Sequence, residues 1–160
     1  MLVAVSEPDG LTRVRADAQA RGIPIEVRER PYANSLEEAA AILGISPADI
    51  AKSIVMRAGS GQYVFAIVPG DASVSFAKLR ALLGVNKLKF PSAAEALEAV
   101  GHERGTITPL GSLQEYPTYV DASLVGRRVS MGSGAHGYSV WVDVDDLVRG
   151  LGATVADIAG

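Results

Sequence analysis

Cysteine is absent from this chain of 160 residues, and histidine occurs only twice. Without thiols the protein has no disulfides, no sulfur ligands for zinc or iron–sulfur clusters, and no thiolate nucleophile. Two histidines also argue against a His-rich metal site. We therefore expect chemistry that uses neither a metal nor a cofactor.

Long apolar runs are also missing. No stretch approaches the roughly 20 apolar residues that span a bilayer. Residues 1–10 include Glu7 and Asp9 and no basic residue, so they do not resemble a secretory signal. We expect a cytoplasmic protein without membrane contact. The length, the 48% of hydrophobic residues and the lack of repeats or linkers predict one domain over residues 1–160.

An excess of positive charge, which is typical of nucleic-acid-binding proteins, is not present either. The net charge is −3, and neutralisation of phosphates supplies most of the affinity of strong non-specific binders. Local basic clusters do occur at Lys78–Arg80, Lys87–Lys89 and Arg127–Arg128. They are either solvated surface or a local patch that binds the end of an RNA.

The order of elements predicts an α/β fold with a mixed sheet and flanking helices. Ser35 with Glu38, and Ser92 with Glu95, have the spacing of helix capping boxes, and glycines follow several apolar helical patterns. Helices are expected near 11–20, 35–44, 75–84, 92–101 and 145–150, and strands near 25–28, 53–57, 63–68, 85–90, 118–121, 127–131 and 138–144. Strands outnumber helices without strict alternation, which disfavours a doubly wound parallel sheet. Strand 63–68, almost entirely apolar, is expected to be central.

Residues 132–137 form a literal G-x-G-x-x-G, the pattern of dinucleotide-binding loops. In those proteins a helix follows the loop and its N-terminus binds the pyrophosphate. Here the strand-like residues 138–142 follow instead, so a Gly-rich hairpin loop with a close backbone approach is favoured. Ser133 and His136 lack the context of a serine hydrolase, because there is no G-x-S-x-G motif. His102, beside Glu103 and Arg104, is expected on the surface.

Lys52 is the one charge in residues 50–56. It is either a surface lysine at a junction between elements, with its stem along apolar side chains, or a desolvated ammonium that faces a cleft and binds an anion. The segment Gly105–Gly111 combines two glycines with Pro109. It is either a tight connection or a rigid loop whose exposed N–H groups form an oxyanion hole.

Together these segments resemble the YbaK / prolyl-tRNA synthetase-associated domain family of editing deacylases. The similarity rests on their order: the helix after Tyr32, residues 43–53 with Lys52, the strand 66–71, the G-x-x-x-P loop at 105–109 and the loop 130–134. It extends from about Thr12 to Ile158.

The resemblance implies a single α/β domain with a mixed, partly barrel-like sheet and flanking helices. It matches Lys52 to the family's functional lysine and Gly105 to its G-x-x-x-P loop, and we take these two as the candidate catalytic residues. The candidate substrate-binding residues lie at the strand end and in the two loops: Tyr32, Ser53, Thr106, Ile107, Thr108, Pro109, Gly111, Ser130, Gly132, Ser133 and Gly134. Tyr32, Ile107 and Met131 are candidate walls of the amino-acid pocket.

The implied activity is hydrolysis of a mischarged aminoacyl-tRNA, with Cys- or Ala-tRNA(Pro) as the expected substrate. Water would attack the ester carbonyl, and main-chain N–H groups near Gly105 and Thr106 would stabilise the oxyanion. The implied partners are the 3′ acceptor end of tRNA and prolyl-tRNA synthetase. The alternative is a non-catalytic module of the same fold that binds tRNA or a synthetase without turnover.

Overall fold

The computed structural model describes residues 7–59 and 61–160. Part of the segment 1–10 and residue 60, which lies between the expected strands 53–57 and 63–68, are therefore outside the described residues. The elements in chain order are α1 (Asp9–Ala20), β1 (Ile25–Glu29), α2 (Leu36–Leu43), η1 (Pro47–Asp49), β2 (Ala51–Ala58), β3 (Gln62–Pro69), α3 (Phe76–Leu83), β4 (Leu88–Lys89), α4 (Ala93–Val100), β5 (Thr118–Asp121), η2 (Ala122–Leu124), β6 (Arg128–Met131), β7 (Tyr138–Asp143), α5 (Val144–Leu151) and β8 (Thr154–Ala156). None of the helices in this described part has the length and hydropathy needed to cross a membrane.

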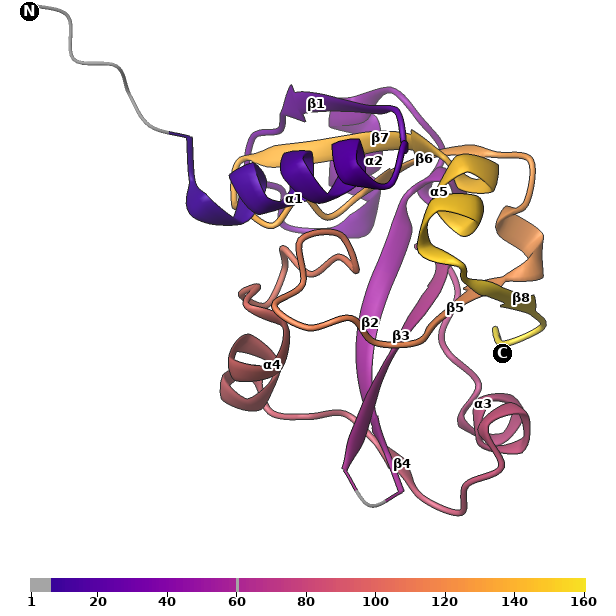
Figure 1. Ribbon diagram of the computed structural model, residues 1–160. Helices are drawn as coiled ribbons and strands as arrows, with labels where there is room; N and C mark the ends of the chain where they lie inside the picture. The colour runs from indigo at the N-terminus through magenta and orange to yellow at the C-terminus, as the bar shows by residue number, and fades with distance from the viewer. Residues whose placement is uncertain (1–6, 60) are drawn as a thin grey trace, which may run out of the picture.

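The strands form two sheets (Figure 1). The smaller has the order β1-β7-β6 and is antiparallel. The larger has the order β4-β2-β3-β5-β8, in which β2 and β3 are antiparallel while β3–β5 and β5–β8 are parallel. A parallel bridge between Ile50 and Ser130 joins the two sheets. The prediction of an α/β fold with a mixed sheet and flanking helices is confirmed.

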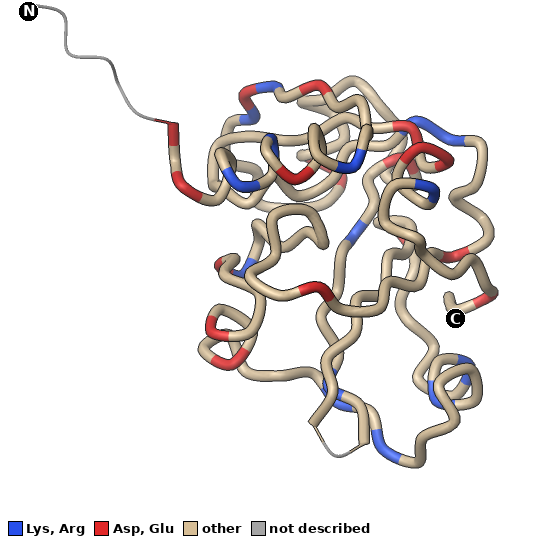
Figure 2. Tube along the Cα trace, viewed as in Figure 1, with Lys and Arg blue, Asp and Glu red and all other residues tan. Residues whose placement is uncertain are grey.

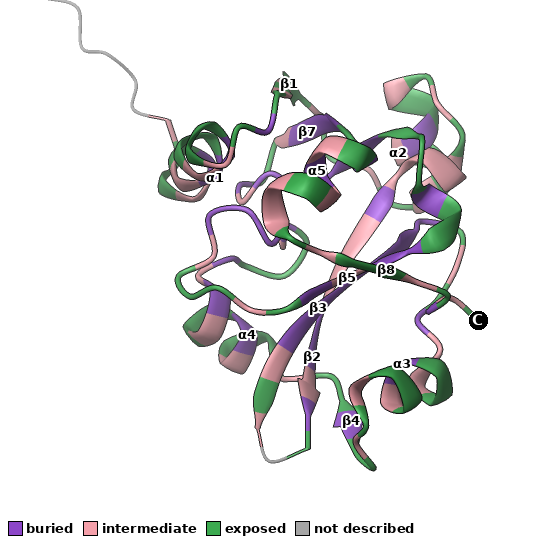
Figure 3. Ribbon diagram, turned by 45° about the vertical axis from the view of Figure 1, so that its right-hand side comes forward, coloured by how far each residue is buried: buried purple, intermediate pink, exposed green. Residues whose placement is uncertain are grey.

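Strand β3 is the middle strand of the larger sheet, as its apolar sequence predicted. Residues 64–68 are all buried, and their side chains contribute to three apolar clusters, in one of which Phe65 packs with Val55 and Val100. Ile67 packs with α1, β7 and α5, whereas Val64, Ala66 and Val68 pack toward α3 and Ile158. Figure 3 shows the buried β2–β3 hairpin extending between the flanking helices. This hairpin carries the site described below.

The capping residues in the sequence predicted the helix ends close to their observed positions. Ser92 and Glu95 form the complete capping box, a contribution typically near 1 kcal/mol. At α2 only half of the predicted box forms. The Ser35 side chain accepts from the Glu38 amide, but the Glu38 carboxylate accepts from the amide of Asn34. This carboxylate therefore holds the residue before the cap.

Two strand predictions are wrong in their limits. The strand expected at 53–57 begins at Ala51, so Lys52 lies inside β2 and not at a junction between elements. The strand expected at 85–90 is reduced to Leu88–Lys89. It pairs with β2 only at Arg57 and Ala58, which leaves the first half of that side of β2 as a free edge.

Candidate functional site

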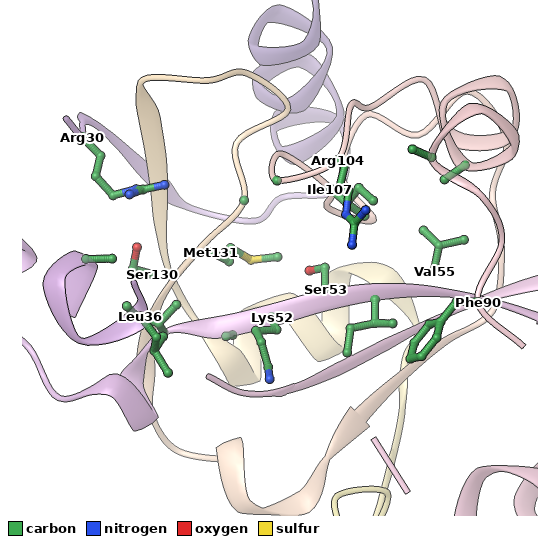
Figure 4. A pocket seen from close by; sticks show the side chains of 18 of the residues that line it. Arg30, Leu36, Lys52, Ser53, Val55, Phe90, Arg104, Ile107, Ser130 and Met131 are labelled. Atoms are coloured by element: carbon green, nitrogen blue, oxygen red, sulfur yellow. The ribbon is translucent and has the colours of Figure 1, made fainter. Parts of the chain in front are cut away.

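A cavity of about 650 Å³ lies along this free edge of β2, where the two sheets meet. Its walls come from β2, the inner face of α2, the start of α4, the loop at 104–107 and the end of β6 (Figure 4). The bridge from Ile50 to Ser130 brings β6 against the start of β2. Residues far apart in the sequence thus converge on one pocket, of a size typical for small-molecule sites.

The cavity is cationic. Arg30, Lys52 and Arg104 line it, and the described lining residues include no aspartate, glutamate or histidine. A pocket with three cations and no carboxylate favours an anionic ligand such as a phosphate. The described lining thus offers no carboxylate or imidazole that could act as a general base.

Lys52 lines this pocket with its stem, while its ammonium is directed elsewhere. Side chains alternate along β2, and Figure 4 shows Lys52 on the opposite side of the strand from Ser53. Its Nζ donates a hydrogen bond to the carbonyl of Ala72. The ammonium therefore lies at the rim, and not beside the loop that contains Gly105.

Ser53 faces the interior of the pocket. Its Oγ is buried and has no hydrogen-bond partner among the described residues, and Figure 4 shows it directed to the side of Met131 and Ile107. An unpartnered buried hydroxyl is costly, by about 1–3 kcal/mol. A ligand group or water at this position would restore the missing hydrogen bond.

The loop after α4 is tied to helix α1 at both of its ends. Arg13 donates from Nη2 to the carbonyl of Gly101 at 2.6 Å and from Nε to that of Gly111 at 3.0 Å. The Gly111 amide donates to Asp17 at 2.9 Å. Arg13 and Asp17 thus connect both ends of the loop to α1, and we call this arrangement the clasp. It holds the segment between the two ends as a rigid wall of the cavity.

His102 lies inside this clasp, and the prediction of a surface histidine is wrong. The side chain is 1% exposed. Its Nε2 lies 2.9 Å from the Leu110 carbonyl, and its Nδ1 lies 3.4 Å from Nη2 of Arg13. These partners assign the neutral ring with the proton on Nε2. Burial lowers the pKa of His102 and the positive charge of Arg13 lowers it further, against the opposing effect of the Leu110 carbonyl.

The lowered pKa predicts acid-sensitive folding. The unfolded chain binds a proton at His102 near pH 6.5, whereas the folded protein does so only at lower pH. This contribution to stability is therefore complete above about pH 6.5 and is lost as the pH falls toward the folded pKa. Urea unfolding at pH 7 and pH 5 should show a loss of stability in the wild type that is smaller in His102→Gln.

The matched control is His136→Gln, which replaces an exposed histidine. It measures what the loss of a histidine outside the core does to stability at the same two pH values. Asp121 titrates in a separate range. Burial acts to raise its pKa, but hydrogen bonds from Ser123, Ile158 and Ala159 outweigh that effect and the pKa is lowered. Its contribution to stability is lost only in more acidic solution. An equal loss of stability between pH 7 and pH 5 in the wild type and in His102→Gln would contradict the prediction for His102.

Two loops touch by their backbones next to the pocket. The Gly134 amide donates to the Thr106 carbonyl at 2.9 Å. A Cβ atom on Gly132 would lie 2.3 Å from the Ile107 carbonyl oxygen, so only glycine allows this approach. The close backbone contact predicted for the Gly-rich loop is confirmed, and the strand β7 follows that loop in place of a helix.

The amides available to a ligand differ from those expected. The Thr106 N–H donates to the Glu103 carbonyl at 2.9 Å, so it is already used within the loop. The amides of Gly105 and Ile107 have no acceptor within the described ranges 7–59 and 61–160. Both residues line the cavity, and they are the remaining candidates for an oxyanion hole.

The cavity brings together six of the residues proposed from the sequence: Lys52, Ser53, Gly105, Ile107, Ser130 and Gly132, with Met131 beside them. Tyr32 is 83% exposed and is not among the lining residues. The other proposed residues, which hold or flank the loops outside the pocket, are Thr106, Thr108, Pro109, Gly111, Ser133 and Gly134.

Ser133 and His136 do not form a catalytic pair. The Ser133 hydroxyl donates to the carbonyls of Ala135 and Tyr138, at 2.8 and 3.1 Å. His136 lies at the surface with its Nε2 3.1 Å from a Glu103 oxygen. Each side chain has a structural partner.

Four further residues line the cavity and were not predicted as pocket residues from the sequence: Arg30, Phe90, Arg104 and Tyr138. A signal existed for Arg104, which directly precedes Gly105. Phe90 is 60% exposed and contacts Phe76 edge to face, with ring centroids 5.2 Å apart. An exposed aromatic ring fixed beside a cationic pocket is a suitable stacking surface for a base.

Comparison with known proteins gives consistent matches. A family model described as “Aminoacyl-tRNA editing domain” matches residues 30–149. A proline–tRNA ligase of Bacillus licheniformis is 36% identical over 106 residues, which are 66% of this chain, but the chain spans only 18% of that protein's length. The uncharacterized protein YwhH of Bacillus subtilis is 36% identical over 90 residues, 56% of this chain and 57% of its own.

A solved structure, described as that of a candidate trans-editing enzyme for prolyl tRNA synthetase, is similar over 97% of this chain and 99% of its own. The TM-score is 0.88 and the sequence identity is 26%. The two chains therefore share the same fold over nearly their whole length.

Proposed function

The chain belongs to the aminoacyl-tRNA editing domain family, and from this premise we propose that it hydrolyses the ester of an amino acid wrongly attached to tRNA. The substrate we propose is tRNA(Pro) that carries alanine or cysteine. The similarity to part of a proline–tRNA ligase and to a candidate trans-editing enzyme for prolyl tRNA synthetase supports this choice of tRNA. A prolyl-tRNA synthetase is the proposed partner that releases the substrate.

The observation that carries the proposal is the pairing of a cationic cavity with available backbone amides. Arg30, Lys52 and Arg104 line the pocket and complement a terminal nucleotide with its phosphate. The amides of Gly105 and Ile107 suit the oxygen that becomes negative when an ester carbonyl is attacked. Both features meet the needs of an aminoacyl ester at the end of an RNA.

The proposed reaction is direct attack by water. The water oxygen bonds to the ester carbonyl carbon, the bond from that carbon to the ribose oxygen breaks, and the proton released by water ends on the ribose oxygen. The lining residues offer no carboxylate or imidazole to accept this proton. The adjacent ribose hydroxyl relays it, as the resemblance to the family suggests, and the Ser53 hydroxyl holds the water or the amino group of the substrate.

Selection by size follows from the walls of the pocket. Ile107 and Met131 line the cavity beside Ser53, and a small side chain such as that of alanine or cysteine would fit against them. The ring of proline would have to displace them. Steric exclusion is the simpler form of discrimination, because a pocket gains only about 1–3 kcal/mol from each added methylene.

A deacylation panel tests the proposal. The purified protein is mixed with Ala-, Cys-, Ser- and Pro-tRNA(Pro), and release of each amino acid is followed over time. We expect hydrolysis of the alanyl or cysteinyl ester and survival of the prolyl ester. Binding of the same tRNAs without hydrolysis of any ester would instead support the non-catalytic module.

A further inference from the structure

A second groove lies at the Arg57–Gly59 end of β2, whereas the cavity lies along residues 50–55 of the same strand. It has a volume of about 570 Å³ and is lined by four cations, Arg57, Arg80, Lys87 and Lys89, with no carboxylate among its described lining residues. Figure 2 shows these basic segments gathered around α3 and β4 at one end of the molecule. From Ala72 to Ala94 the sequence contains four basic residues and no Asp or Glu. This concentration contrasts with the net charge of −3.

Two like charges of this groove face each other in the sheet, which lowers the stability of the strand pair. Arg57 and Lys89 are directly opposite each other across the β2–β4 pair, and like charges in this position destabilise a sheet. Glu95 compensates Arg57 at 3.0 Å. Arg80, Lys87 and Lys89 have no ion-pair partner in residues 7–59 and 61–160. Among the described residues one carboxylate, Glu95, acts on the four cations of this groove, so the groove keeps an excess of positive charge that favours an anionic ligand.

Phe90 connects this groove to the cavity. It follows Lys89 in the chain, lines the cavity and is fixed by its edge-to-face contact with Phe76. The order along the surface is therefore pocket, exposed ring and basic groove. A single nucleic-acid strand requires this order of features when its last residue enters a pocket, because its bases stack on aromatic rings while its phosphates follow cations.

We propose that the groove of Arg80, Lys87 and Lys89 binds phosphates of the RNA strand that leads into the cavity, with a terminal base against Phe90. The proposal deepens the proposed function and rests on it for the identity of the RNA. It assigns the recognition of tRNA to two separate surfaces, the cavity for the aminoacyl end and the groove for the adjoining strand.

The test compares two triple variants with the same loss of charge. The groove variant is Arg80→Ala/Lys87→Ala/Lys89→Ala. The control is Arg127→Ala/Arg128→Ala/Arg149→Ala, which removes three exposed cations elsewhere that pair with Asp49, with Glu26 and Asp143, and with Asp146. Affinity for fluorescently labelled tRNA(Pro) that carries no amino acid is measured from 50 to 200 mM salt. Hydrolysis of the alanyl ester of adenosine, which carries no phosphate, is measured in parallel, and thermal unfolding checks the folding of both variants.

Each phosphate contact adds about 0.7–0.9 to the slope of log affinity against log salt. Between 50 and 200 mM salt, three such contacts weaken the affinity by about 20- to 40-fold, and the groove variant should lose this part of the salt dependence. We expect this change in the groove variant and wild-type behaviour in the control, with the short ester hydrolysed equally by all three proteins. Equal salt slopes in the groove variant and the control would overturn the inference. Altered slopes without hydrolysis of any ester would support the groove while contradicting the proposed reaction.

Discussion

Replacement of Lys52 by alanine is expected to lower kcat/KM for the mischarged tRNA by about 100-fold or more, the range seen when one charge-stabilising group is lost. Lys52 is one of three cations around a pocket whose described lining has no acid. In the absence of substrate its ammonium donates to the Ala72 carbonyl at the rim. A phosphate that enters the pocket is a stronger acceptor than this carbonyl, so the flexible side chain can exchange one partner for the other.

The structural cost of this substitution should be small. It removes one hydrogen bond to a backbone carbonyl, worth about 1 kcal/mol, and the thermal midpoint should fall by only a few degrees. Lys52→Met is the matched control, because it keeps most of the apolar stem and removes the charge. Both variants should lose activity alike. A folded Lys52→Ala or Lys52→Met protein with wild-type deacylation would refute the role assigned to the ammonium.

Replacement of Gly132 by alanine is the second change with a large expected effect. The new Cβ would lie 2.3 Å from the carbonyl oxygen of Ile107 and 3.0 Å from that of Thr106. Backbone must therefore move, and the loop at 101–111 has little freedom because Arg13 and Asp17 tie both ends to α1. We expect a loss of about 1–3 kcal/mol in unfolding free energy, as for other overpacked sites.

Activity should fall further than stability. A displacement near 1 Å of catalytic groups can cost about 100-fold in rate, and the amides of Gly105 and Ile107 lie in the segment that must shift. Gly152→Ala is the control, because its Cβ would meet no atom within 4 Å and only its positive φ of 62° strains the backbone, which costs about 1 kcal/mol away from the cavity. Urea unfolding and single-turnover deacylation measure the two effects. Wild-type turnover in Gly132→Ala would contradict the assignment of these amides to the reaction.

The parts predicted well from the sequence are those with local causes. Ser92 and Glu95 define a helix start through contacts within four residues, and the apolar run at 63–68 requires cover on both faces. The order of the motifs was sufficient to indicate the family. The resemblance also named Lys52, Gly105, Ser130 and Gly132, and all four line the cavity.

The parts that were missed depend on contacts between distant segments. His102 is buried because Arg13, 89 residues earlier, and the Leu110 carbonyl surround its ring. The Thr106 amide is used by a turn to Glu103 that composition alone does not indicate. The direction of the Lys52 ammonium follows from its position within β2, which began two residues before the predicted limit.

The clasp made by Arg13 and Asp17 lies outside the segment that the family model matches. The family model matches residues 30–149, whereas the helix that fastens both ends of the pocket loop spans Asp9–Ala20. The residues that line the cavity and the helix that holds its loop thus belong to different parts of the chain. A fragment cut to the matched region would retain every lining residue of the cavity and lose the brace that keeps the wall in position. The matched region therefore contains the cavity, while a part of its mechanical support precedes that region in the chain.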